Sequence, residues 1–203
     1  MRKLVLKMSM SVDGFVAGRL ADSDWMFRGS TRDSAAWVFE TLAGAGIHAI
    51  GRKTFEAWAG FWPTSGSPMA RPMNDVPKVV FTRHPTFDPG ALSTNPEQSI
   101  AERSWTQARI ASDNLEIELD RLKQEPGDYI LAQGGVDFAR SLVESGLVDE
   151  YRFAVMPVAL GSGDQLFSGL SNELDLELVS STAFPGGAIG NIFRPKTNNG
   201  STR

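Results

Sequence analysis

The chain has 203 residues, contains no cysteine and carries a net charge of −4 at pH 7. The lack of cysteine excludes disulfides, thiol catalysis and cysteine-ligated metals, and two histidines are too few for a histidine-based metal cluster. An acidic chain has no overall basic field that would favour nucleic acid or an anionic membrane. Any recognition of phosphate must therefore be local.

The composition also bounds the domain organisation. A hydrophobic fraction of 41% is typical of a globular protein of one sizeable domain, which we place at residues 1–195. The polar residues 196–203 are expected to form a disordered tail. No run approaches the roughly 18 apolar residues that span a bilayer, and no apolar signal segment precedes the first strand, so we expect a cytoplasmic protein.

Predicted strands and helices alternate along the chain. Strands are expected at 3–10, 47–50, 78–82, 105–110, 129–132, 151–158 and 176–184. Helices are expected at 34–43, 54–59, 113–123 and 138–144, with a turn-rich loop at 11–18 and a long polar loop at 86–104. This order predicts an α/β fold, in which helices flank a mostly parallel central sheet that ends in an antiparallel hairpin.

Three predicted strands are each followed by residues suited to bind an anion. The first strand end carries Gly51, Arg52, Lys53 and Thr54, the second carries Thr82 and Arg83, and the third carries Gly134 and Gly135. Ligands of parallel sheets bind outside the carboxyl ends of the strands, where free N–H groups of helix N-termini attract phosphate. The three segments together therefore predict a nucleotide cleft.

Each segment alone has a plainer interpretation. The first could be an ordinary strand-to-helix turn with surface charges, and Thr82-Arg83 could end a strand facing solvent. Gly134-Gly135 could be a simple turn, since the chain lacks a complete G-x-G-x-x-G fingerprint. As binding groups, the Thr82 hydroxyl and the Arg83 guanidinium would suit a 2′-phosphate, which favours NADP over NAD.

Five strings in a characteristic order carry a family resemblance. They occupy residues 10–17, 51–56, 133–135, 145–151 and 156–167, and read MSVDGFVA, GRKTFE, QGG, SGLVDEY and MPVALGSGDQLF. With them the chain resembles the dihydrofolate reductase-like superfamily, and within it the family of the RibD C-terminal domain, the reductase of riboflavin biosynthesis. The resemblance implies a dihydrofolate reductase-like fold, NADPH as the cofactor and a small heterocyclic substrate.

The resemblance also assigns roles to individual residues. Gly51, Arg52, Lys53 and Thr54 would meet the pyrophosphate and the 2′-phosphate region, and Thr82 and Arg83 would flank the adenosine. Gly134, Gly135 and Val136 would line the pyrophosphate and the nicotinamide ribose, with a cis peptide at the glycines as a further hypothesis. Ser9, Val16 and Ala17 would border the nicotinamide, beneath a covering loop that contains Gly14.

The substrate side is assigned by the same resemblance. Dihydrofolate reductases use a buried carboxylate on the first helix, and Asp33 stands near that place. Asp33 is equally explained as a helix-start residue stabilised by the helix dipole. Asp24 and Trp25 are expected in the pocket wall. Family members often build homodimers from their closing strands, so a homodimer is expected.

Two departures keep the substrate open. Folate reductases carry an arginine just before the third strand, where this chain has Val76-Pro77-Lys78. Riboflavin-pathway reductases are usually fused to a zinc deaminase whose signature needs cysteines. A stand-alone reductase acting on another heterocycle is therefore expected. The alternatives are a dihydrofolate reductase and a non-catalytic nucleotide- or drug-binding protein.

Overall fold

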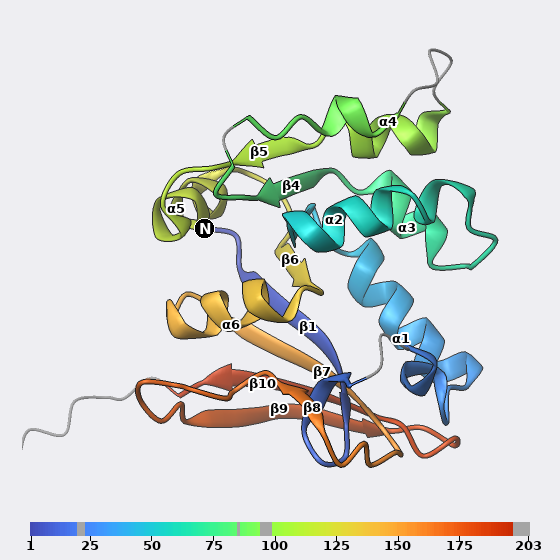
Figure 1. The fold of residues 1–203 in the computed structure, drawn as a ribbon. Coiled ribbons are helices and arrows are strands. Elements are labelled where there is room, and N and C mark those ends of the chain that lie inside the picture. The colour runs from blue at the N-terminus through green and yellow to red at the C-terminus, as the bar shows by residue number, and fades with distance from the viewer. Residues whose placement is uncertain (20–22, 85, 94–98, 197–203) are drawn as a thin grey trace, which may run out of the picture.

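The computed structural model describes residues 1–19, 23–84, 86–93 and 99–196 (Figure 1). Within these ranges, eight strands form one sheet in the order β5-β4-β3-β6-β1-β7-β10-β9. The six strands from β5 to β7 run parallel to their neighbours, and β10 pairs antiparallel with both β7 and β9. The predicted α/β architecture with a closing antiparallel hairpin is confirmed.

The strands of the large sheet are β1 (Leu4–Ser11), β3 (Ile47–Gly51), β4 (Lys78–Phe81), β5 (Arg109–Ala111), β6 (Ile130–Gln133), β7 (Glu150–Met156), β9 (Leu176–Ala183) and β10 (Ile189–Pro195). The helices are α1 (Arg32–Ala43), α2 (Arg52–Ala59), α3 (Ala70–Asp75), α4 (Ile100–Thr106), α5 (Leu115–Gln124) and α6 (Val136–Glu144). Short 3₁₀ helices are η1 (Asp24–Phe27), η2 (Trp62–Thr64) and η3 (Pro89–Leu92). None of these described helices is long and apolar enough to cross a bilayer.

Helices cover both faces of the sheet, which explains why its central strands are continuously apolar. On one face, Leu4 and Leu6 of β1 join one core cluster with α5 and α6. On the other, Val5 of β1 joins a second cluster with α1, α2, α3 and α4. The alternation of β1 residues between the two clusters follows from the period of two in a strand.

One predicted strand begins later than expected, because its first two residues belong to a helix. Trp105, expected to open a strand at 105–110, lies near the end of α4, and the strand β5 begins only at Arg109. The helix starts with a capping box, in which the Ser99 side chain accepts from the Glu102 N–H and the Glu102 carboxylate accepts from the Ser99 N–H. Part of the predicted loop at 86–104 is therefore helical, while 94–98 lies outside the described residues.

The closing strands differ from the prediction in their partners. The predicted strand at 151–158 is β7, which runs parallel to β1, and the hairpin consists of β9 and the unpredicted β10. A second unpredicted pair, β2 (Phe15–Gly18) with β8 (Gly163–Gln165), forms a small separate sheet. Most of the predicted tail lies outside the described residues, but the Lys196 N–H donates to the Asp175 carbonyl at 2.9 Å.

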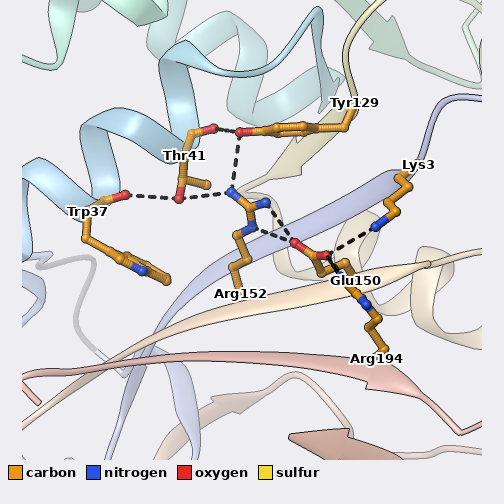
Figure 2. Close-up of polar contacts among 7 residues, drawn as sticks. All are labelled: Lys3, Trp37, Thr41, Tyr129, Glu150, Arg152 and Arg194. Carbon is orange, nitrogen blue, oxygen red and sulfur yellow. Dashed lines mark hydrogen bonds and ion pairs between the residues drawn. The ribbon is translucent and has the colours of Figure 1, made fainter. Parts of the chain in front are cut away.

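A polar network fastens α1 to the amino ends of the central strands (Figure 2). Glu150 at the start of β7 is buried and pairs with Arg152 at 2.7 Å, with further ion pairs to Arg194 and Lys3. Arg152 also donates to the Thr41 hydroxyl of α1 at 3.3 Å. The network holds α1, which walls the cavity described next.

Candidate cofactor and substrate site

A cavity of ≈ 1050 Å³ opens beside the carboxyl ends of β1 and β6. Its lining comes from β1, β2, η1, α1, α2, α3 and the start of α6, together with Ala154 and Met156 of β7 and the β9–β10 hairpin at Phe184. In Figure 1, α1 and α2 stand on one side of this region and α6 on the other. The cavity lies where parallel sheets place their ligands.

Two helix N-termini lie side by side at one end of the cavity. Helix α2 begins after Gly51 and α6 after Gly135, and neither N-cap has a side chain to accept from the free N–H groups. The preceding strands, β3 and β6, are neighbours in the sheet. The two helices approach closely. A β-carbon built on Gly51, the N-cap of α2, would lie only 2.9 Å from Cβ of Phe138 in α6. Two uncapped helix starts next to each other suit a diphosphate.

The glycine pair between β6 and α6 leaves no room for side chains. Gly134 and Gly135 have φ of +71° and +75°, a region that L-residues rarely adopt. A β-carbon on Gly135 would lie 2.9 Å from the Thr54 hydroxyl oxygen, and one on Gly134 would lie 2.7 Å from the Trp58 ring. Glycine is therefore required at both positions, and Gly134, Gly135 and Thr54 all line the cavity. The hypothesis of a cis peptide here is wrong, since the peptide bonds of the described residues are all trans.

The structure brings part of the predicted cofactor site together in this cavity. The predicted residues that line it are Ser9, Val16, Ala17, Thr54, Gly134, Gly135 and Val136. They come from four separate segments of the chain, β1, β2, α2 and the β6–α6 turn. Gly51 sits just behind them as the N-cap of α2.

The predicted cations lie outside the cavity lining. Arg52 is engaged with Glu56 one helical turn later, at 2.9 Å, and Lys53 is exposed. Thr82 accepts the His84 N–H on its hydroxyl at 3.0 Å, and Arg83 is exposed beyond the end of β4. Their contact with a nucleotide stays a prediction, which would require the ligand to extend from the cavity across the ends of β3 and β4.

The predicted substrate residues are also outside the lining. Asp33 is exposed at the second position of α1, a helix whose capping box is made by Thr31 and Ser34. This placement favours the helix-start interpretation of Asp33. Asp24 is exposed at the start of η1, and Trp25 is buried against β7 residues, whereas the next two residues, Met26 and Phe27, do line the cavity.

Lys7 is a candidate functional residue that the sequence analysis missed. Its side chain lines the cavity from the centre of β1 and donates to the Ser9 hydroxyl at 3.2 Å. Burial lowers its pKa from 10.5 to about 8, so that the ammonium can give up a proton near neutral pH. The signal was present in the alternation of β1, where Lys7 shares a face with Val5 and Ser9.

No group of three His, Cys, Asp or Glu side chains suited to a metal ion occurs among the described residues. Polar groups of the lining next to the glycine pair and on β1 include the Thr54 and Ser9 hydroxyls, the Gln133 amide and the Lys7 ammonium.

The fold defines a class of protein, the α/β proteins with a dihydrofolate reductase-like sheet. Dihydrofolate reductase of Enterococcus faecalis superposes with a TM-score of 0.57 at 13% identity, over 96% of this chain and 97% of the enterococcal one. Residues 2–189 match the model of the RibD C-terminal domain family, and the chain belongs to that family.

Two further relatives fit this assignment. Protein YyaP of Bacillus subtilis, itself uncharacterized, is 26% identical over 95% of this chain and 94% of its own length. The Thermotoga maritima diaminohydroxyphosphoribosylaminopyrimidine deaminase/5-amino-6-(5-phosphoribosylamino)uracil reductase has 17% identity and a TM-score of 0.63. The match covers 96% of this chain but 57% of the Thermotoga chain.

Proposed function

We propose that the protein is an NADPH-dependent reductase of a small heterocyclic substrate. The observation that carries the proposal is the pair of uncapped helix N-termini, at Gly51 and Gly135, beside a cavity that also contains Lys7. Family membership supports a reductase, because the Thermotoga relative is named for a uracil reductase activity.

The residues of the cavity fit a dinucleotide. The Gly134-Gly135 turn and the Thr54 hydroxyl would hold the pyrophosphate, since all three residues line the cavity and glycine leaves the backbone N–H groups uncovered. Ser9, Ala17 and Val136 would border the nicotinamide and its ribose. When bound, NADPH would supply a hydride to the substrate.

Lys7 is the proposed proton donor. Reduction of a C=N or C=O bond needs one proton on the heteroatom for each hydride on carbon. Lys7 is paired in register with Gln133, the residue directly before the glycine pair, so it lies one strand away from the proposed cofactor site. With a pKa of about 8, the ammonium predominates at pH 7 and can be replenished from solvent.

The dihydrofolate reductase alternative is not favoured. Lys78 stands where a folate reductase would carry its tail-binding arginine, but its ammonium is buried. It donates to the carbonyls of Asn74 and Val76 and to the Ser104 hydroxyl. The Lys78 side chain is fully occupied by these contacts and does not reach the cavity.

The direct test is oxidation of NADPH, followed by absorbance, with purified protein and a panel of pterins, pyrimidines and quinones. The proposal expects turnover with at least one of them. Tight NADPH binding without turnover across the panel would favour the non-catalytic nucleotide-binding alternative. Failure to bind NADPH would reject the proposal.

We also propose a cytoplasmic homodimer that forms along β9. This edge strand exposes Leu178 and Val179, by 57% and 43%, and an apolar edge is a template for pairing with a second copy. Light scattering should give twice the mass of the 22.1 kDa chain for the wild type and the monomer mass for Leu178→Asp. A monomeric wild type would reject the proposal.

A further inference from the structure

Aromatic and sulfur-containing side chains wall much of the cavity. They reach it from η1, α1, η2, α3 and the β9–β10 hairpin, and include Phe27, Trp37, Trp62, Met69, Met73 and Phe184. Trp37 packs directly on the hairpin, as a β-carbon built on Gly190 would lie only 3.0 Å from the Trp37 ring. These walls offer flat apolar surfaces and few hydrogen-bonding groups.

Positive charge is scarce on these walls. Lys7 and Arg32 are the cations among the described lining residues, and Glu40 of α1 adds a negative charge. Lys7 lies on the sheet beside Ser9, and Arg32 is exposed at the first position of α1. Arg71 of α3 is turned to Asp75 at 3.5 Å and is not part of the lining. A phosphate buried against the aromatic walls would therefore find only the exposed Arg32 among the described lining residues of α1, and burying a charge without a buried partner is strongly unfavourable.

Phe27 gives an independent indication of what binds. It lines the cavity from η1 and yet is 70% exposed, although its neighbour Trp25 is only 3% exposed. An exposed phenyl ring at the rim of an apolar cavity gains stabilisation when an apolar ligand covers it, at about 25 cal/mol per Å² buried. The rim of the cavity, like its walls, therefore favours an apolar ligand.

We propose that the substrate of this cavity is a neutral, planar aromatic ring system with an apolar substituent, and that it carries no phosphoribosyl group. This inference rests on the proposed reductase function and narrows its substrate. The ring would lie between the walls of α1 and α3, and the apolar substituent would reach Phe27 at the rim.

A matched pair of fluorescent probes tests the inference on the NADPH-saturated protein. Phenylnaphthylamine is neutral, and anilinonaphthalene sulfonate is the same ring system with one negative charge. We expect the neutral probe to bind at least ~10-fold more tightly than the sulfonate. This ratio corresponds to about 1.4 kcal/mol of binding free energy lost by burying the charge. The substitution Met69→Gln keeps the length of the side chain but makes the wall polar, and should weaken the neutral probe several-fold. The control Ile117→Ala, on the exposed face of α5, should not change binding.

A second arm uses 5-amino-6-(5-phosphoribosylamino)uracil, the compound in the name of the Thermotoga enzyme. We expect that it neither displaces the neutral probe nor oxidises NADPH. Its reduction, or tighter binding of the sulfonated probe, would overturn the inference while leaving the reductase proposal intact. An absence of NADPH binding would instead reject the reductase proposal, and the probe comparison could still be made on the protein alone.

Discussion

Asp13 accepts a hydrogen bond from the backbone N–H of Gly161 at 2.7 Å, and so joins the β1–β2 turn to the segment before β8. The other carboxylate oxygen accepts from the Leu160 N–H at 3.1 Å and from the Ser11 hydroxyl at 2.6 Å. The Ser11 hydroxyl and the Gly161 N–H lower the pKa of Asp13 to about 2. Asp13 is therefore ionised at any working pH and holds the small β2–β8 sheet beside the cavity.

Replacing Asp13 with asparagine should loosen this covering sheet. Three donors converge on the two carboxylate oxygens of Asp13. In asparagine an NH₂ group, which cannot accept, replaces one of these oxygens, so at least one contact must be lost. Because Val16 and Ala17 of β2 line the cavity, we expect the Kd for NADPH to rise by about tenfold, with little change in melting temperature. Isothermal titration calorimetry measures the affinity, and Asp164→Asn on β8 is the matched control. An unchanged affinity would show that the Asp13 contacts do not support the site.

Lys7→Met should remove turnover without unfolding the protein. Loss of a general acid typically lowers the rate ~10²-fold or more. Burial disfavours the charged form of Lys7, and so the neutral, apolar methionine should leave the melting temperature unchanged or raise it. Thermal scanning and single-turnover kinetics measure the two effects. A variant with full activity would contradict the proton-donor role.

The pH dependence gives a second test of Lys7. Since the donor is the ammonium, kcat/KM of the wild type should be level below pH 7 and fall as pH rises through about 8. In Lys7→Arg the charge remains but its pKa lies above the accessible range, so the fall near pH 8 should disappear. The free energy of unfolding changes with pH in the opposite direction to the activity. The reason is that Lys7 binds a proton more tightly in the unfolded chain than in the folded one. Lys7 should therefore make folding more favourable as pH rises from about 8 towards 10.5.

Glu150→Gln should reduce stability and leave cofactor binding intact. The substitution leaves Lys3, Arg152 and Arg194 without their shared carboxylate, and breaking a buried ion pair costs roughly 3 kcal/mol. Urea denaturation measures the loss. The control Asp113→Asn removes an exposed partner of the exposed Arg121 and should cost less than about 1 kcal/mol. Equal losses in the two variants would contradict the importance assigned to the buried network.

The effect of Glu150 should also depend on pH in a defined direction. Burial opposes its ionisation, but the hydrogen bond and charge of Arg152, with Arg194 and Lys3, outweigh burial and lower its pKa below 4.5. A lowered carboxyl pKa contributes stability above the unfolded value, which is lost as pH falls through the folded value. The difference in stability between wild type and Glu150→Gln should therefore shrink below about pH 4.

The sequence predicted those features that depend on local chemistry. Glycines after buried strands marked the ends of β3 and β6, and the order of the strings indicated the family. The helix α4 was missed although the Ser99-x-x-Glu102 capping box marks its start in the sequence, because its seven residues are too few to show an apolar period. The strand β10 was missed because its residues include Gly190, Asn191 and Pro195, which disfavour strands, and its burial shows no period of two.

The sequence predicted the site residues that lie at glycine turns, but not how tertiary packing would bring residues from separate segments together. Gly135 and Thr54 are far apart in sequence, and only the neighbouring positions of β3 and β6 bring them together. Arg52 carries the right chemistry for phosphate, but the i,i+4 contact to Glu56 occupies it. The alternation of β1 places Lys7 on the same face as Val5, but only the structure shows that this face borders a cavity at Lys7.

If the uncapped starts of α2 and α6 hold NADPH, a titration with two nucleotides should detect it. Purified wild type and Gly135→Ala are titrated with NADPH and NADH, with tryptophan quenching as the signal, since Trp37, Trp58 and Trp62 line the cavity. We expect the wild type to bind NADPH more tightly than NADH. We also expect a loss of at least ~10-fold in Gly135→Ala, where a β-carbon meets the Thr54 hydroxyl at a φ of +75°. Wild-type protein that binds neither nucleotide, or a variant that binds as tightly as the wild type, would contradict this role of the two helix starts.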